Sequence, residues 1–65
     1  MEVKNNLKEL RLEKGVNQTE LASLVGVSRQ TIHAIEVSKY TPSVELALKI
    51  SKTLELNVEE IFSLK

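Results

Sequence analysis

Four residues in the middle of the chain have side chains suited to contacting the edges of DNA bases. An arginine can donate two hydrogen bonds to guanine, and a glutamine can pair with both edge groups of adenine. A histidine can donate or accept a hydrogen bond, whereas an alanine offers only a methyl contact. The four candidates are Arg29, Gln30, His33 and Ala34. The alternative is that these residues form an ordinary solvated helix face. For His33, base contact and a solvated position are weighed equally.

Helix geometry places these candidates together. With about 100° of rotation per residue, Thr31, Ile32 and Ile35 define the buried side of a helix that we expect at 29–37. The opposite face then carries Gln30, His33, Ala34 and Val37, with Arg29 at its N-terminal edge. The first residues of a recognition helix penetrate the major groove most deeply, so Gln30 and Arg29 are the strongest candidates for base contact.

The preceding segment predicts a partner helix for this one. Apolar residues at the spacing of one buried helical face indicate a helix at 18–25, namely Leu21, Ala22 and Val25. Gly26 can take a positive φ and so end that helix in a sharp turn, after which Ser28 fits as the N-cap of the next. This pattern is typical of a helix-turn-helix, and the alternative is a plain corner between two helices.

Three further helices are expected around this pair, at 6–14, 43–54 and 58–62. Gly15 fits the end of the first, and Pro42 with Thr41 as N-cap fits the start of the fourth. Three capping boxes are predicted at helix starts, formed by Asn6 with Glu9, Asn17 with Glu20, and Asn57 with Glu60. The apolar stripe of the first helix is expected to be Leu7, Leu10 and Leu12. The fold class is therefore all-α.

Composition restricts the possible functions. The 65-residue chain has room for one domain, which we expect to span residues 1–65. It has no cysteine and one histidine, so neither a thiolate nucleophile nor a metal site of paired ligands is expected. A bundle of this size is too small for a deep catalytic pocket, and no apolar run approaches the roughly 20 residues of a membrane span. We expect no enzyme, no cofactor, no small-molecule ligand, no membrane partner and a cytoplasmic location.

A set of residues falls at fixed offsets within the motif: Gln18, Ala22, Gly26, Val27, Ile32, Ile35 and Glu36. Together with KYTPSVELALKIS at 39–51, they resemble the lambdoid phage repressor and Cro family of helix-turn-helix regulators, and the chain is similar to its small stand-alone repressors. The resemblance covers nearly the whole chain. It implies a compact five-helix, lambda-repressor-like domain whose third helix enters the DNA major groove. It also implies base contacts at Arg29, Gln30 and Ala34.

Contacts with DNA phosphates are expected from donors that flank the groove. The resemblance implies a phosphate hydrogen bond from the side chain of Gln18. Position along the motif makes three further residues candidates for phosphate contact, namely Thr31, Lys39 and Tyr40.

The charge balance gives a mixed indication. The net charge is zero, which argues against a nucleic-acid partner. However, an acidic cluster lies near the C-terminus, at Glu55, Glu59 and Glu60, and we expect it to point away from DNA. The resemblance implies that Glu36 forms a structural ion pair with Arg11; the alternative is a solvated Glu36.

The C-terminal segment has more apolar groups than one short helix needs: Leu56, Ile61, Phe62 and Leu64. These residues predict a symmetric homodimer, with a short β-pairing of residues 1–4 with 63–65 beside the interface. A dimer reaches two half-sites about one DNA turn apart, so the operator is expected to be an inverted repeat. The alternative is that these side chains complete the core of a monomer.

Together, these patterns predict a sequence-specific double-stranded DNA-binding transcriptional regulator that acts as a repressor. The alternative is a protein-interaction adaptor or antitoxin-type partner protein, because a fold by itself does not define a function.

Overall fold

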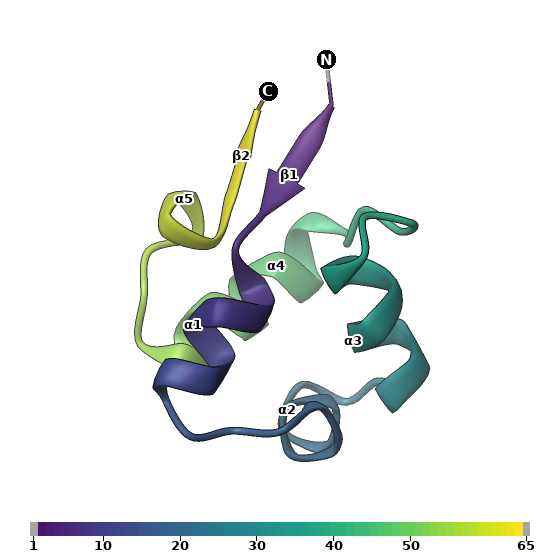
Figure 1. The fold of residues 1–65 in the computed structure, drawn as a ribbon, viewed down its shortest axis with the longest axis vertical. Helices are drawn as coiled ribbons and strands as arrows, with labels where there is room; N and C mark the ends of the chain where they lie inside the picture. The colour runs from purple at the N-terminus through teal and green to yellow at the C-terminus, as the bar shows by residue number, and fades with distance from the viewer. Residues whose placement is uncertain (1, 65) are drawn as a thin grey trace.

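The computed structural model describes residues 2–64, and within them five helices and two short strands follow one another along the chain (Figure 1). Their bounds are β1 (Val3–Asn5), α1 (Leu7–Glu13), α2 (Gln18–Val25), α3 (Arg29–Glu36), α4 (Val44–Leu54), α5 (Val58–Ile61) and β2 (Phe62–Leu64). Each helix begins and ends within one residue of the bounds expected from the sequence. The expected all-α fold with a small terminal pairing is confirmed.

Local hydrogen bonds define α2 and α3, which form the helix-turn-helix. At the start of α2, Asn17 Oδ1 accepts the N–H of Glu20 at 2.8 Å and Glu20 Oε1 accepts the N–H of Asn17 at 3.0 Å, so this capping box is confirmed. Gly26 ends α2 with a φ of +79°, a left-handed conformation that suits glycine. Ser28 Oγ then accepts the N–H of Thr31 at 3.2 Å and caps α3.

The caps of α1 and α4 differ from those predicted. The Asn6–Glu9 capping box is wrong: Asn6 is the N-cap, but its side chain makes no capping hydrogen bond, and Asn5 Oδ1 instead accepts the N–H of Leu7 at 3.0 Å. At α4, the N-cap is Ser43 rather than Thr41, since Ser43 Oγ accepts the N–H of Leu46 at 3.1 Å. Pro42 consequently lies before the helix and not in its first turn.

The core is formed by buried apolar residues from all five helices: Leu7, Leu21, Ala22, Val25, Ile32, Ile35, Leu46, Ile50, Leu54 and Ile61. Helix α2 packs against both α3 and α4. Each fully buried leucine or isoleucine stabilises the fold by about 1.5–3 kcal/mol. One expected core position is wrong, because Leu12 is 59% exposed and the neighbouring Arg11 is buried in its place.

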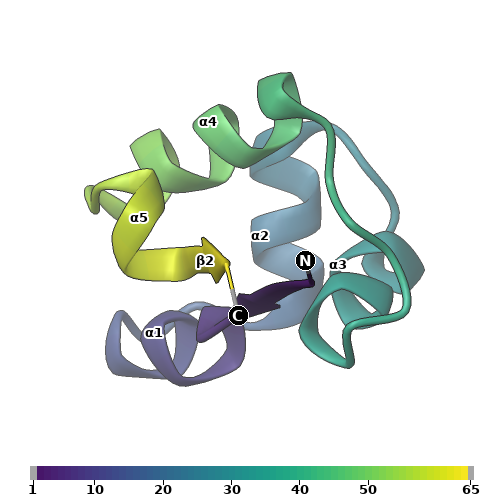
Figure 2. The ribbon, with the colours of Figure 1, turned by 90° about the horizontal axis from the view of Figure 1, so that it is seen from above.

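The two strands form an antiparallel ribbon that joins the ends of the described chain. Val3 pairs with Leu64, Lys4 with Ser63 and Asn5 with Phe62. The pairing was expected at 1–4 with 63–65, of which residues 1 and 65 lie outside the described part. Seen from above, the ribbon lies between α1 on one side and α4 with α5 on the other (Figure 2). Asn5 Nδ2 also donates to Ile35 O at 2.9 Å, which ties the ribbon to the end of α3.

None of the helices within residues 2–64 is long and apolar enough to cross a membrane.

Candidate nucleic-acid interface

The outer face of α3 carries the residues expected to contact bases. Arg29, Gln30 and His33 are exposed, and Ala34 is half-buried, while Ile32 and Ile35 of the same helix are buried in the core. The apolar side therefore anchors α3 to the domain, and the polar side is left to solvent. This is the arrangement by which a helix can be inserted into a groove without losing its own packing.

Gln18, expected to bond a DNA phosphate, joins the start of α2 to three residues of α3. Its Nε2 donates to Glu36 Oε1 at 2.9 Å and lies 3.3 Å from His33 Nδ1. Its Oε1 accepts a hydrogen bond from Arg29 Nη1 at 2.9 Å. The amide is therefore already engaged within the protein, and one consequence is that it holds the Arg29 guanidinium beside α2.

Behind Gln18 lies a buried ion pair between α1 and α3. Arg11 Nε donates to Glu36 Oε2 at 2.7 Å, and Arg11 Nη2 lies 3.3 Å from Glu36 Oε1. The two side chains are only 6% and 3% exposed, and Arg11 Nη1 also donates to the carbonyl of Val16 at 2.9 Å. Buried charges need such complete pairing, because an unpaired one is strongly destabilising. Arg11, Glu36, Gln18 and Arg29 thus form one continuous network from the core to the surface.

The other expected phosphate donors lie around the ends of α3. Thr31 is half-buried, and its Oγ1 lies 3.0 Å from Ser28 Oγ within the cap of the helix. Lys39 and Tyr40 are exposed in the loop after α3, where the N–H of Lys39 donates to Ala34 O at 2.9 Å and Ser38 takes a positive φ of 63°. The loop therefore brings these two side chains back beside the helix.

A hollow of about 460 Å³ joins these segments into one surface. It lies between α3, the loop after it and the start of α4, and its lining includes Val27, Gln30, Ala34, Tyr40 and Leu46. The sequence had indicated Gln30, Ala34 and Tyr40 separately. Val27 and Leu46 had not been singled out as neighbours of Tyr40, because that proximity depends on the path of the loop.

The acidic residues expected to avoid DNA lie far from this surface. Glu59 and Glu60 belong to α5, and Glu55 follows α4 in a left-handed conformation with φ +57°. Helices α3 and α5 lie at opposite sides of the molecule in both views (Figures 1 and 2). A chain with zero net charge can therefore still present a face whose cations, Arg29 and Lys39, are separated from its acidic end.

The residues expected at a dimer interface differ in how far they are buried. Ile61 is 1% exposed and belongs to the core of the chain itself, so it is unavailable to a partner. Leu56 and Phe62 are half-buried against that core, whereas Leu64 is 63% exposed. The structure adds Val44 and Leu48 on the outer face of α4, with 77% and 54% exposure. Their spacing of four residues, visible in the sequence, places both side chains on one face of α4.

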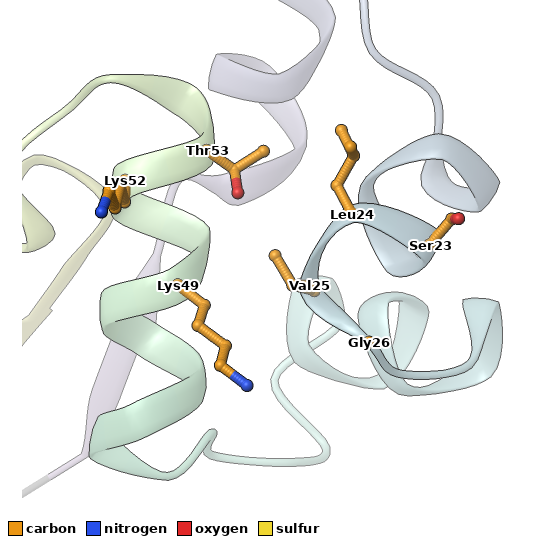
Figure 3. A pocket seen from close by; sticks show the side chains of 7 residues that line it. All are labelled: Ser23, Leu24, Val25, Gly26, Lys49, Lys52 and Thr53. Carbon is orange, nitrogen blue, oxygen red and sulfur yellow. The ribbon is translucent and has the colours of Figure 1, made fainter.

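A second hollow, of about 510 Å³, lies between the end of α2 and α4 (Figure 3). Leu24 and Val25 line it from α2, and Lys49, Lys52 and Thr53 line it from α4. Lys49 pairs with Glu45 one turn earlier at 3.1 Å. The residues lining this hollow include none of those expected to contact DNA, and among residues 2–64 no cluster of three or more metal-ligating side chains is found.

Known proteins resemble this chain over most of its length. It is 48% identical over 63 residues to the uncharacterised HTH-type transcriptional regulator YgzD of Bacillus subtilis, covering 97% of this chain and 96% of YgzD. It is 50% identical over 60 residues to an uncharacterised HTH-type transcriptional regulator of Methanocaldococcus jannaschii, with 92% and 91% of the two chains covered.

Solved structures of similar proteins also superimpose on this chain. The restriction-modification controller protein C.AhdI from Aeromonas hydrophila superimposes with a TM-score of 0.78 at 33% identity, over 83% of this chain and 82% of its own. A Bacteroides fragilis protein gives a TM-score of 0.86 at 24% identity, over 94% and 98% of the two chains, which shows a shared fold.

The helix-turn-helix family, whose members are transcriptional regulators and not enzymes, matches residues 7–61, from the first residue of α1 to the last residue of α5. The chain therefore belongs to the Cro/C1-type helix-turn-helix family of DNA-binding transcriptional regulators.

Proposed function

We propose that this regulator is a repressor that binds an inverted-repeat operator in double-stranded DNA as a homodimer. The observation that carries the proposal is the outer face of α3, where exposed Arg29, Gln30 and His33 lie on a helix anchored by Ile32 and Ile35. Hydrogen-bonding groups discriminate between base pairs when they are accessible and carried on a rigid element. Helix α3 is fixed by its buried side, and the side chains of its outer face are accessible.

In this proposal, Gln30 and Arg29 contact base edges, and His33 and Ala34 extend the contact along the groove. Gln30 is exposed and lines the hollow beside the loop, so its amide can reach an adenine. Arg29 is held at the start of α3 by its hydrogen bond to Gln18, at the end of the helix that enters the groove first. Half-buried Ala34 supplies an apolar contact of the kind a thymine methyl group makes.

Phosphate contacts in this proposal come from Lys39 and Tyr40, which are exposed beside α3. Gln18 and Thr31 remain candidates, although both side chains already have partners within the protein. Gln18 can also contribute its backbone N–H, the first of α2, since such groups attract anions. The backbone N–H of Thr31 is already bonded to the Ser28 cap, so Thr31 would have to use its hydroxyl.

The homodimer places two copies of α3 in successive major grooves. Its interface is proposed to involve the ribbon and its surroundings, where Phe62 and Leu64 line a shallow hollow of about 440 Å³. Exposed apolar groups of this kind are stabilised when a second copy covers them. Two half-sites about 34–36 Å apart would then be contacted at once, which increases both affinity and specificity.

The decisive experiment combines selection of bound fragments from genomic DNA with a reporter assay. We expect the selected fragments to share an inverted repeat, and the protein to lower transcription from a promoter that carries it. Enrichment of a single asymmetric half-site would contradict the dimeric operator, and raised transcription would contradict repression.

The zero net charge favours one second candidate, a protein-interaction adaptor or antitoxin-type partner. Salt dependence separates the two functions, because each phosphate contact releases about one counterion and makes affinity fall with salt. A chain that fails to retain DNA fragments at low salt, and that co-purifies with a second protein, would favour the adaptor.

A further inference from the structure

The orientation of the Gln18 amide is determined by the charged groups around it. Glu36 can only accept hydrogen bonds when ionised, and Arg29 can only donate them. Gln18 must therefore turn its Nε2 toward Glu36 Oε1 and its Oε1 toward Arg29 Nη1, as observed at 2.9 Å on each side. Flipping the amide would place oxygen against oxygen and N–H against N–H.

This orientation of the amide determines which ring nitrogen of His33 carries the proton. The second N–H of the Gln18 amide lies against His33 Nδ1 at 3.3 Å, so Nδ1 must present a lone pair. A neutral imidazole with an accepting Nδ1 carries its proton on Nε2. Because His33 is exposed, that Nε2–H is accessible on the outer face of α3.

We propose that neutral His33 is a positioning residue of the recognition surface: its Nδ1 holds Gln18, Gln18 holds Arg29, and its Nε2–H is left to donate to an acceptor on DNA. The inference rests on the proposed DNA-binding function. It assigns His33 the role of a donor to a purine N7, a carbonyl oxygen of a base or a phosphate oxygen. Arg29 and His33 then act as a pair of donors whose geometry depends on one shared amide.

Protonation of His33 disrupts this arrangement. An imidazolium has N–H groups on both nitrogens, so its Nδ1–H opposes the N–H of Gln18 and the contact is lost. Of the charged groups in the network, Arg29 repels the imidazolium, and Glu36 attracts it but is already paired with Arg11. The proposed role of His33 therefore requires the neutral imidazole.

The first test measures the tautomer in the free protein by long-range ¹H–¹⁵N NMR correlation at pH 8. The chain has one histidine, so its two ring nitrogens are assigned without ambiguity. We expect a protonated Nε2 and an unprotonated Nδ1, and in Gln18→Ala a shift toward a mixture of tautomers. Protonation at Nδ1, or a spectrum unchanged in Gln18→Ala, would overturn the inference. This measurement needs no DNA, so its result stands apart from that of the proposed function.

The second test compares binding to the selected operator with binding to random DNA at pH 8, and takes the ratio of the two affinities as the specificity ratio. At pH 8, His33→Ala should lower the ratio by about threefold to tenfold, which corresponds to the loss of one net hydrogen bond.

His33→Gln is the matched control, because its amide can accept a hydrogen bond from Gln18 and donate one to DNA. We expect this variant to retain most of the wild-type specificity ratio. If His33→Gln lost as much of the ratio as His33→Ala, His33 would not be the positioning residue.

Discussion

At the scale of single residues, the chemistry of this protein lies in a chain of side chains that runs from Arg11 in the core to Arg29 on the surface. Each member is held by the one before it: Arg11 pairs with Glu36, Glu36 accepts from Gln18, and Gln18 accepts from Arg29. Restricting these long side chains before binding lowers the entropy that DNA recognition would otherwise cost. The inner pair therefore supports both stability and function.

Replacing one member of the Arg11–Glu36 pair should destabilise the protein more than replacing both. We expect Arg11→Met to lower the free energy of unfolding by about 3–5 kcal/mol, because Glu36 would remain buried without its partner. The double variant Arg11→Met, Glu36→Leu should recover much of that loss, since no unpaired charge remains. Urea denaturation followed by circular dichroism measures both. Equal losses in the single and double variants would show that packing, and not charge, dominates at this site.

Substitutions of Gln30 and Lys39 should affect sequence specificity and general DNA affinity separately. We expect Gln30→Ala to lower discrimination between operator and mutated operator by about 1–3 kcal/mol, because the amide that reads a base is lost. Lys39→Ala should instead weaken binding to all DNA sequences alike, and it should reduce the slope of log affinity against log salt concentration by about one. Competition binding at several salt concentrations distinguishes them. Gln30 is not a base reader if its variant retains wild-type specificity.

At the scale of elements, the helix-turn-helix depends on the turn between α2 and α3. Gly26 ends α2 at φ +79°, and Ser28 starts α3 two residues later with a capping hydrogen bond. So short a connection leaves little freedom in the angle between the helices. The packing of α2 against both α3 and α4 then presents the outer face of α3 to solvent.

Substitution of Gly26 tests how far the turn needs its left-handed conformation. A Cβ built at Gly26 would meet no atom within 4 Å in the described part of the chain, so the cost of alanine is backbone strain alone. We expect Gly26→Ala to destabilise the protein by about 1–2 kcal/mol. Gly26→Asn is the control and should cost less, because asparagine tolerates this conformation. Thermal denaturation would refute this account if alanine proved as stable as glycine.

At the scale of the whole molecule, zero net charge and an uneven surface occur together. The acidic residues of α5 lie across the domain from α3, and the exposed apolar side chains Val44, Leu48 and Leu64 lie outside the core. The first feature permits DNA binding without a strongly basic domain. The second leaves apolar surface that a second copy of the chain can cover.

The dimer can be tested with two leucines of similar exposure. We expect Leu64→Glu, on β2, to shift the protein to a monomer and to weaken operator binding, because a buried unpaired carboxylate opposes association. Leu12→Glu is the matched control, since Leu12 on α1 is 59% exposed and Leu64 is 63% exposed. Sedimentation equilibrium at micromolar concentration measures the outcome. A wild-type monomer, or equal effects of the two variants, would exclude this interface.

The sequence by itself determined what depends on neighbouring residues. The Asn17–Glu20 capping box, the Ser28 cap and the left-handed Gly26 all act within about four residues, so their residue types carry the information. Periodic apolar spacing likewise indicated the core faces of α2 and α3, and the whole motif indicated the family.

Only the tertiary structure decided what depends on contacts between distant segments. Gln18 meets Glu36 across eighteen residues, and nothing local indicates that its amide is engaged there rather than free for a phosphate. The ribbon places the side chain of Asn5 where it accepts the N–H of Leu7, a bond that the N-cap Asn6 does not make. The packing of α5 buries Ile61 while leaving Leu64 exposed. The physical reason is the same in each case: periodicity identifies an apolar or polar residue, whereas its partner is selected by how the elements pack.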